Sequence, residues 1–486
     1  MTQDRQNWRR KALIFIAIVS AVKLLILPLM DLQPQDAYYW QYSRHLSIGY
    51  FDHPPVHAWT CWLTTGIFGD NAFGIRFGPW LYGLGLLILV FYFAERIFDS
   101  ETGFWATVAA GLTPLFAIGS GILTPDPPLM FFWTLAVFIG YIAMDEDRRW
   151  LWLIAGFSAG FALLSKYTAV FLGAGFFLAL VLHSKGRKHL ATPWPYLALI
   201  TAGIAFLPQI IWNAQNDWAS FAFQSTRRAG ELSKWRLDLL GGMFVAQLML
   251  VSPVLFVGVI WASFKGLWRG IFAREFKGLY LAAFAVPTII FFTVVALRYW
   301  VKMNWLAPAY ITSAIAFVGA VIHRPRGKKF LKWGIGIAGV ETVLLYVLVL
   351  TPFVPLTGES AYWLGWREAA EVVQEQRETM SEGTFIAGWG YKVPSELAFY
   401  LPDRPETHSN EIFGYPGLNY SYWTDIDELI GRDCIFVADD REPFRVENEL
   451  RELFDLVDEP IEVNPTRAGK KITTFRIWNC YGYRGP

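Results

Sequence analysis

The chain has 486 residues, of which 54% are hydrophobic and only 17% are charged, whereas soluble domains carry about 25% charged residues. Its formal net charge is +1, so it lacks the strongly basic character that favours binding to nucleic acid. Many of its 23 Trp and 39 Phe residues stand at the ends of apolar runs, as in membrane-interface belts. The composition excludes an ordinary soluble domain and indicates a protein that crosses a membrane many times.

The first apolar run, residues 11–30, is long enough to span a bilayer. No cleavage-site pattern of small residues follows it, so we expect a retained membrane helix rather than a signal peptide. Further apolar runs predict about eleven membrane helices in total, within a range of eleven to thirteen. They are expected near residues 11–30, 76–98, 103–119, 127–144, 150–165, 168–182, 194–212, 237–262, 278–297, 305–322 and 333–351.

Lys and Arg are distributed unevenly between the loops that join these runs. With the N-terminus in the cytoplasm, the inner loops gather cations near residues 9–11, 96, 148–149, 185–188, 265–277 and 324–332. The outer loops hold fewer. Because cytoplasmic loops are enriched in Lys and Arg, this bias predicts an odd number of crossings in the plasma (inner) membrane, with everything after Thr351 outside the cytoplasm.

At about residue 357 the long apolar runs end, and the composition becomes more polar, with polar and apolar residues mixed. The apolar spacing of residues 365–377 predicts an amphipathic helix, and residues 394–400 predict another short helix. Residues 384–387, 434–438 and 472–477 predict short strands. The predicted fold is therefore an all-α polytopic membrane domain, residues 1–356, with a first outer loop at 31–75, followed by a small extracytoplasmic α/β domain, residues 357–486.

Two of the three cysteines, Cys434 and Cys480, fall in the predicted outer domain. An oxidising compartment would permit a disulfide between them. Two unpaired core residues are the other interpretation, and the sequence leaves both open.

The first outer loop concentrates polar and aromatic residues. Residues 34–58 have the sequence PQDAYYWQYSRHLSIGYFDHPPVHA, with carboxylates at Asp36 and Asp52 and titratable or cationic groups at Arg44, His45 and His53. Ionisable groups at a membrane boundary are expensive and often mark a substrate path. The loop therefore predicts a site for a polar group carried on a lipid.

Other ionisable residues fall on the same predicted side of the membrane. Asp126 could instead cap a helix that begins at the following prolines, and Lys166 could be a snorkelling helix-end lysine. The arginine pair at 227–228 could contact lipid headgroups. The full set comprises Asp36, Asp52, His53, Asp126, Lys166, Arg227, Arg228, Arg298 and Lys302. Arg298 and Lys302 stand i, i+4 apart, so on a helical turn they would share one face, with Trp300 and Trp305 at the headgroup level beside them.

Five segments together resemble a known family. The motifs DAYYW, GYFDHPP, TPDPPLMFFW, LLSKYTAVF and KMNWLAPAY, in this order, resemble the polyprenyl-phosphate-sugar-dependent glycosyltransferases of the C superfamily. The nearest branch contains bacterial relatives of dolichyl-phosphate-mannose protein mannosyltransferases and the lipid A aminoarabinose transferase. The resemblance implies an integral-membrane enzyme whose first outer loop bears the catalytic acid. The implied donor is a polyprenyl-phosphate sugar, and the implied acceptor is a lipid, glycan or protein of the envelope.

One position departs from the family pattern. The family usually has Asp-Glu before the aromatic pair, whereas this chain has Gln35-Asp36. Asp36 could take over the role of the base by a small shift of the loop. Alternatively, the acceptor could need no base, because a phosphate is already ionised whereas a hydroxyl must lose its proton.

Glycosyl transfer then suggests a role for each candidate. Attack on the anomeric carbon leaves a polyprenyl phosphate, whose developing charge calls for cations. We expect no organic cofactor, and a divalent metal ion stays open, with Asp52 and His53 as weak candidate ligands. The predicted catalytic residues are Asp36 and Asp126, the donor phosphate ligands are His53, Lys166, Arg298 and Lys302, and the substrate contacts are Tyr38, Tyr39, Trp40, Asp52 and Arg227.

Two other classes of function are alternatives to the enzyme. A transporter or flippase of lipid-linked sugars is the main alternative, but such proteins commonly show inverted repeats and helices broken near the midplane. The sequence has no pseudo-symmetric halves, and its acidic residues cluster in outer loops. A structural scaffold would fit the outer domain but not the pattern of carboxylates. Besides its substrates, the expected partners are membrane lipids.

Overall fold

The computed structural model describes residues 3–229, 235–442, 444 and 447–486, without the side chains of residues 226–229. The chain divides into two compact units. We call residues Met1–Leu27, Ile48–Thr60 and Arg76–Tyr346 the membrane unit, and residues Pro28–Ser47, Cys61–Ile75 and Val347–Pro486 the C-terminal unit. The predicted first outer loop therefore contributes to both units.

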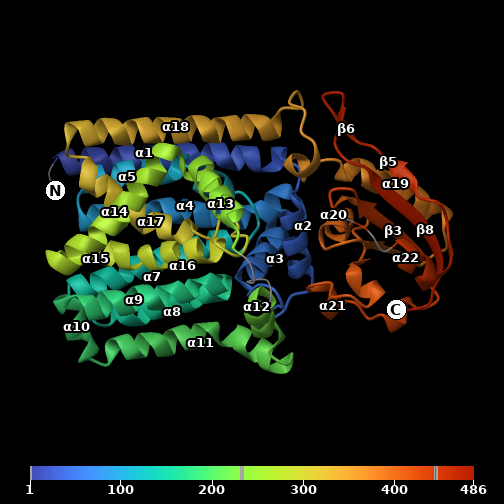
Figure 1. The fold of residues 1–486 in the computed structure, drawn as a ribbon, viewed down its shortest axis with the longest axis horizontal. Coiled ribbons are helices and arrows are strands. Elements are labelled where there is room, and N and C mark those ends of the chain that lie inside the picture. Colours follow the sequence, from blue (N-terminus) through green and yellow to red (C-terminus); the bar gives the residue numbers. More distant parts are fainter. Residues whose placement is uncertain (1–2, 230–234, 443, 445–446) are drawn as a thin grey trace. The chain divides into compact units, whose positions relative to one another are not determined.

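The membrane unit is built from apolar helices. Within the described residues, seven helical segments are long and apolar enough to cross a membrane, and a bent pair would make eight. The long segments run side by side in Figure 1. They are α1 (Gln3–Ile26, continued to Leu29), α4 (Ala72–Ile97), α7 (Asp126–Asp145), α11 (Trp194–Gln215), α14 (Pro253–Phe272), α15 (Phe276–Ala283) with α16 (Val286–Ala296), and α18 (Pro325–Leu350).

Shorter helices complete this unit. Helix α9 (Val170–Leu182) and the 3-10 turn before it form the bent pair with α10 (Ser184–Leu190), at an angle of 106°. The others are α5 (Ser100–Leu112), α6 (Pro114–Gly119), α8 (Leu151–Ser165), α12 (Ala219–Ala229), α13 (Leu237–Val251) and α17 (Ala307–Val321), and α3 (Val56–Phe68) belongs in part to each unit. A mostly helical chain with many apolar helices is confirmed, whereas the number of crossings stays a prediction.

The apolar run 237–262, expected as one helix, is broken. Ser252 has a positive φ of 70°, which separates α13 from α14. Pro253 opens α14, at a position where its missing N–H is not needed. The Ser252 hydroxyl bonds the carbonyl of Gly334 at 3.2 Å, so the break is tied to α18. The expectation of one continuous helix was wrong because a contact with a distant helix stabilises the break.

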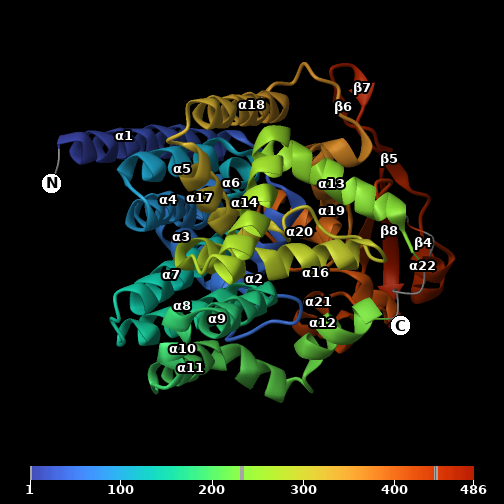
Figure 2. The same ribbon diagram turned by 60° about the vertical axis from the view of Figure 1, so that its left-hand side comes forward.

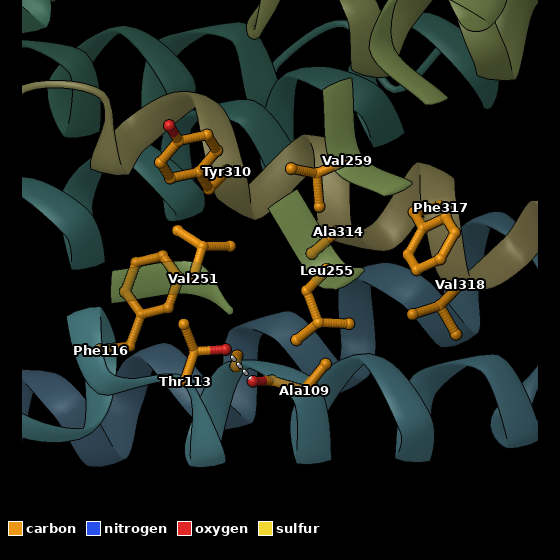
Figure 3. A pocket seen from close by; sticks show the side chains of 11 residues that line it. Ala109, Thr113, Phe116, Val251, Leu255, Val259, Tyr310, Ala314, Phe317 and Val318 are labelled. Carbon is orange, nitrogen blue, oxygen red and sulfur yellow. Dashed lines mark hydrogen bonds between the residues drawn. The ribbon is translucent and has the colours of Figure 1, made fainter. Parts of the chain in front are cut away.

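The run 103–119, also expected as one helix, is divided at Thr113 into α5 and α6. The Thr113 hydroxyl donates to the carbonyl of Ala109, and Pro114 begins the next helix. Beside this break lies an apolar cavity of about 20 Å³ between α5, α14 and α17, with Tyr310 in its wall (Figure 3). None of the predicted site residues lines this cavity, which we attribute to packing.

Helices α7, α8 and α11 form the layer that supports the site. Glycines allow a close approach here, because a Cβ at Gly156 would lie 2.1 Å from the carbonyl oxygen of Ala198, and one at Gly160 would lie 2.4 Å from that of Ala202. Small residues let membrane helices pack with their backbones close together. Figures 1 and 2 both show α7, α8 and α11 as neighbours, apart from the group of α1, α5 and α18. This packing fixes the end of α8, from which Lys166 follows.

The C-terminal unit contains the predicted α/β region. Among its described residues is a six-stranded sheet in the order β2-β1-β3-β8-β4, with β5 also on β8; β1 pairs parallel with β2 and β3, and β8 pairs antiparallel with its neighbours. Apolar clusters cover both faces. The strands are β1 (Phe385–Gly388), β2 (Thr407–His408), β3 (Cys434–Asp439), β4 (Phe454–Val457), β5 (Ile461–Val463) and β8 (Phe475–Tyr483), with a separate pair β6 (Thr466–Arg467) and β7 (Lys470–Lys471).

The helices of this unit are α2 (Pro34–Arg44), α19 (Trp366–Thr379), α20 (Lys392–Tyr400), α21 (Tyr420–Trp423) and α22 (Glu447–Leu453). The predicted helices at 365–377 and 394–400 correspond to α19 and α20, and two predicted strands correspond to β1 and β3. The strand expected at 472–477 begins only at Phe475. Cys434 and Cys480 are partners in the register of β3 and β8, and both are buried free thiols in this structure.

Candidate functional site

A buried ion pair connects the two membrane-unit residues that the sequence singled out most clearly. The Lys166 ammonium lies 2.8 Å from a carboxylate oxygen of Asp126. The side-chain amide of Asn304 donates to the other carboxylate oxygen at 2.6 Å. The Lys166 and Asp126 side chains are only 8% and 15% exposed. Three segments far apart in the chain therefore meet at one carboxylate.

The local sequence explains how these groups are presented. Asp126 is the first residue of α7, directly before two prolines that favour a helix start. Lys166 has extended backbone angles at the end of α8, where the helix stops before the 3-10 turn Tyr167–Ala169. Asn304 lies in the turn that leads into α17. Each side chain leaves a helix end, the place where polar groups can be supplied without breaking a helix.

The geometry decides two alternatives that the sequence left open. Pro125, not Asp126, occupies the N-cap of α7, and the Asp126 carboxylate bonds Lys166 and Asn304 instead of capping its own helix. Lys166 is buried, so it is not a snorkelling lysine. Both residues belong to one buried polar cluster, which we call the Asp126 cluster (Asp126, Lys166 and Asn304).

The segment that carries Asp52 and His53 is pinned to α11. Gln209 donates to the Tyr50 carbonyl at 2.9 Å and accepts from the Tyr50 N–H at 3.3 Å. Gln224 donates to the Asp52 carbonyl at 2.8 Å. These bonds place Asp52, which is buried, and His53, which is partly buried, within the membrane unit.

A metal site is not formed by these two residues alone. Across the described part of the chain there is no group of three or more His, Cys, Asp or Glu residues that could hold a metal ion. Asp52 and His53 therefore supply fewer ligands than a protein metal site needs.

An open groove lies next to Lys166 along the chain. It has a volume of about 300 Å³ and is mainly apolar, with polar groups from Tyr167, Gln224 and Ser225. The remaining lining residues are Leu163, Val170, Phe206 and Phe221. Gln224, which lines the groove, also bonds the Asp52 backbone and so links the groove wall to the segment that bears Asp52 and His53.

Arg298 and Lys302 do not share a helical face, contrary to the expectation from their i, i+4 spacing. The chain from Leu297 to Leu306 forms turns and extended backbone between α16 and α17. Both cations are exposed, and the Arg298 guanidinium lies over the ring of Trp235, 4.7 Å from its centroid. Trp305, expected at the headgroup level, is buried against Phe292.

The aromatic triplet of the first outer loop packs inside the C-terminal unit. The Tyr38 ring packs at a tilt against that of Tyr391, with ring centroids 4.5 Å apart, and the indole of Trp40 donates to Asp70 at 2.8 Å. Tyr38, Tyr39 and Trp40 are all buried. These contacts give the triplet a structural role, and its contact with a sugar stays a prediction.

Asp36 is also buried, on the first turn of α2. Its carboxylate accepts the backbone N–H of Gln33 at 3.2 Å, which forms a capping box. Gln35, where the family usually has an acid, is half-exposed. The segment is a helix rather than the loop that the sequence suggested, so successive side chains point about 100° apart.

The side chain of Arg227 lies outside the described residues, so its predicted substrate contact stays untested. Three residues were not singled out from the sequence: Asn304, Gln209 and Gln224. Asn304 lies in the KMNW motif that drew attention to Lys302, and this motif was the available signal. Gln209 and Gln224 had no such signal, because the backbone groups of Tyr50 and Asp52 that they bond are 159 and 172 residues away.

Comparison with known proteins shows which proteins the chain is similar to in sequence and in fold. A family model described as dolichyl-phosphate-mannose-protein mannosyltransferase matches residues 52–212. Similar structures include ArnT from Cupriavidus metallidurans bound to undecaprenyl phosphate (TM-score 0.61, 14% identity, 98% of this chain and 99% of that chain). The oligosaccharyltransferase of Archaeoglobus fulgidus also matches (TM-score 0.53, 13% identity, 96% and 74%). The chain shares the fold of these two solved membrane proteins.

The names of two sequence relatives state a sugar donor or a lipid acceptor. The lipid A galacturonosyltransferase RgtD of Rhizobium johnstonii is 27% identical over 66% of this chain and 67% of its own length. An undecaprenyl phosphate-alpha-4-amino-4-deoxy-L-arabinose arabinosyl transferase of Edwardsiella ictaluri is 23% identical over 69% of this chain and 61% of its own length. The resemblance to polyprenyl-phosphate-sugar-dependent glycosyltransferases, noted from five motifs, is thereby confirmed.

Proposed function

We propose that this protein transfers a sugar from a polyprenyl-phosphate carrier to an acceptor of the cell envelope, and that the acceptor is lipid A. The observation that carries the proposal is the Asp126 cluster, a buried cation–carboxylate pair at the start of an apolar helix. The names of the relatives support the donor class and the lipid A acceptor.

The cluster suits the departure of a polyprenyl phosphate. The acceptor oxygen attacks the anomeric carbon, the bond from that carbon to the phosphate oxygen breaks, and the polyprenyl phosphate leaves with the bonding electrons. Lys166 can share its ammonium between Asp126 and this phosphate, since an ammonium has three donors. The apolar groove beside Tyr167 would take the first prenyl units.

The remaining predicted residues have roles that rest on the chemistry of the reaction. Asp36 would take the proton of a hydroxyl acceptor, and a phosphate group on lipid A would need no base. His53, Arg298 and Lys302 would bind the donor phosphate, and Asp52 would contact the sugar. We assign Tyr38, Tyr39, Trp40 and Arg227 to the same substrate contacts.

We further infer eleven crossings. The seven long segments, the bent pair and the three shorter apolar helices α8, α13 and α17 support this number. It would place the N-terminus in the cytoplasm and residues 357–486, as an outer domain following residues 1–356, on the far side of the inner membrane. A reporter that is active only in the cytoplasm, fused after Gly358, should be inactive. An active reporter would show that the orientation is the opposite of the one proposed.

Transfer can be tested with the purified full-length protein. It is incubated with polyprenyl-phosphate sugars of several kinds and with lipid A, and mass spectrometry of the lipids detects a mass gain of one sugar. Lipid A from which the phosphate groups have been removed distinguishes a phosphate acceptor from a hydroxyl acceptor. Movement of the donor across vesicles without any transfer would identify a flippase and refute the proposal.

Two variants test the base. Asp36→Asn should lower turnover on a hydroxyl acceptor by about a hundredfold to ten-thousandfold. Gln35→Asp restores the acid that the family usually has, and a faster reaction would place the base at that half-exposed position. Normal turnover by Asp36→Asn would instead exclude a base at Asp36 and favour a phosphate acceptor.

A further inference from the structure

Several cations at the predicted cytoplasmic end of the membrane unit are neutralised by carboxylates. Examples are Arg9 with Glu95 at 2.8 Å and Lys185 with Asp145 at 2.6 Å. A different situation holds where α14 meets the start of α18. Among the described residues there, no ion pair with a carboxylate is made by Lys265, Arg324, Arg326 or Lys329. We call these four residues the α14–α18 basic patch.

The helices hold the patch together. The charges of Arg324 and Arg269 both act on the Lys265 ammonium, and Glu275, which pairs with Arg269 at 2.8 Å, offsets them only in part. Like charges that lie close to each other repel. The protein therefore keeps Lys265 and Arg324 close at an energetic cost.

Tight helix contacts prevent the two cations from separating. The hydroxyls of Ser263 and Ser313 bond at 2.6 Å between α14 and α17. At the turn into α18, a Cβ on Gly327 would lie 2.7 Å from the Val321 carbonyl oxygen. The start of α18 is therefore fixed next to α17, and α17 is fixed next to α14.

The neighbourhood of the patch is apolar and aromatic. Trp261 and Phe264, on the same helix as Lys265, are 42% and 43% exposed. The Lys265 ammonium lies over the Trp261 ring, 4.2 Å from its centroid. Phe330 is exposed on the first turns of α18. This combination of cations and exposed aromatic side chains suits a molecule with an anionic head and an apolar tail.

We propose that the α14–α18 basic patch binds an anionic phospholipid, with the phosphate between Lys265 and Arg324 and an acyl chain along Trp261 and Phe264. Basic pockets between membrane helices are known to bind anionic headgroups. The rule that cytoplasmic loops are basic explains why cations occur at this end, but it does not require two of them to be held together. A phosphate offsets their repulsion, and lipid tails cover the aromatic side chains. The proposal is independent of the transferase activity.

Native mass spectrometry of the full-length protein in detergent can test this site. Phosphatidylglycerol is titrated, with phosphatidylethanolamine as the zwitterionic comparison and glycerol 3-phosphate as the soluble phosphate. The test variant is Lys265→Gln/Arg324→Gln. The matched control, Arg10→Gln/Lys188→Gln, also loses two positive charges from exposed positions but leaves the patch intact.

We expect tighter binding of phosphatidylglycerol than of phosphatidylethanolamine, weakened about fivefold for each patch cation removed. The control should bind as the wild type does. Equal affinity for the two lipids, or equal weakening in both variants, would overturn the proposal. Competition by glycerol 3-phosphate at the concentration of the lipid would also overturn it, because the site would then recognise phosphate without a tail. A melting curve for each variant excludes loss of the fold as the cause.

Discussion

Removing one partner of the Asp126–Lys166 pair should destabilise the membrane unit and abolish activity together. In Lys166→Met, a side chain of similar length loses its charge, and the Asp126 carboxylate is left buried with Asn304 as its remaining partner in the cluster. Leaving one member of a buried ion pair unpaired typically costs about 3–5 kcal/mol.

The geometry gives a similar magnitude. Two unit charges 2.8 Å apart attract each other by about 6 kcal/mol at an effective dielectric constant of about 20. The hydrogen bond from Asn304 at 2.6 Å remains in the variant and offsets part of this loss. We therefore expect the free energy of unfolding to fall by about 3–5 kcal/mol, which equilibrium unfolding in mixed micelles can measure.

A double variant separates stability from chemistry. Asp126→Asn/Lys166→Met removes both charges, and replacing a buried ion pair with neutral groups is often close to neutral for stability. We expect this variant to recover most of the lost stability while its transfer of sugar from a polyprenyl-phosphate donor stays at least a hundredfold below that of the wild type. Kinetics are measured on the same preparations that are used for unfolding.

Two results would refute this reasoning. If Lys166→Met unfolds as the wild type does, the pair is not buried as the structure shows. If the double variant regains both stability and turnover, the pair only supports the fold, and the donor phosphate must be sought elsewhere.

Three further predictions address residues around the site and in the C-terminal unit. Asn304→Ala should lower turnover about tenfold to a hundredfold through loss of a bond to a charged group, with little change in the donor KM; an unchanged turnover would make Asn304 dispensable for orienting Asp126. Lys302→Ala should raise the donor KM about tenfold or more, whereas Arg298→Ala, which loses a cation–π contact with Trp235, should raise it less. If both variants keep the wild-type donor KM, the loop that carries the two cations only contacts lipid headgroups. Burial raises the pKa of Glu411 from 4.5 to about 7, so its contribution to stability is full below pH 4.5 and is lost as the pH rises through 7. Glu411→Gln should therefore exceed the wild type in melting temperature at pH 8 and match it at pH 4, and the same difference at both pH values would contradict this.

Local patterns in the sequence predicted much of the fold. The bounds of helices α19 and α20 lie within two residues of those expected, because apolar spacing records which face of a helix is buried. The break at Ser252 could not be found in this way. Its stabilising bond goes to Gly334, 82 residues further along the chain, and a window of apolar residues contains no trace of such a partner.

The i, i+4 rule failed at residues 298–302 for a related reason. It assumes a helix, and the chain there turns so that Asn304 can reach Asp126, 178 residues earlier. The sequence pointed to the charges at Asp126 and Lys166 because ionisable residues are conspicuous near a membrane. It did not show that they pair with each other, since pairing depends on how α7 and α8 pack.

The residues that the sequence analysis missed share a property that can help to find polar site residues in other membrane proteins. Asn304, Gln209 and Gln224 are uncharged amides, and each joins segments more than 150 residues apart. In a membrane interior a carboxylate or a bent backbone needs hydrogen bonds, and an amide supplies them without adding a further charge to desolvate. A search for polar sites in chains of this kind should therefore weigh each Asn and Gln next to an apolar helix as heavily as each Asp or Lys. If Gln209→Leu left both the stability and the donor KM unchanged, the segment that carries Asp52 and His53 would not depend on such a bond, and this weighting would be unjustified.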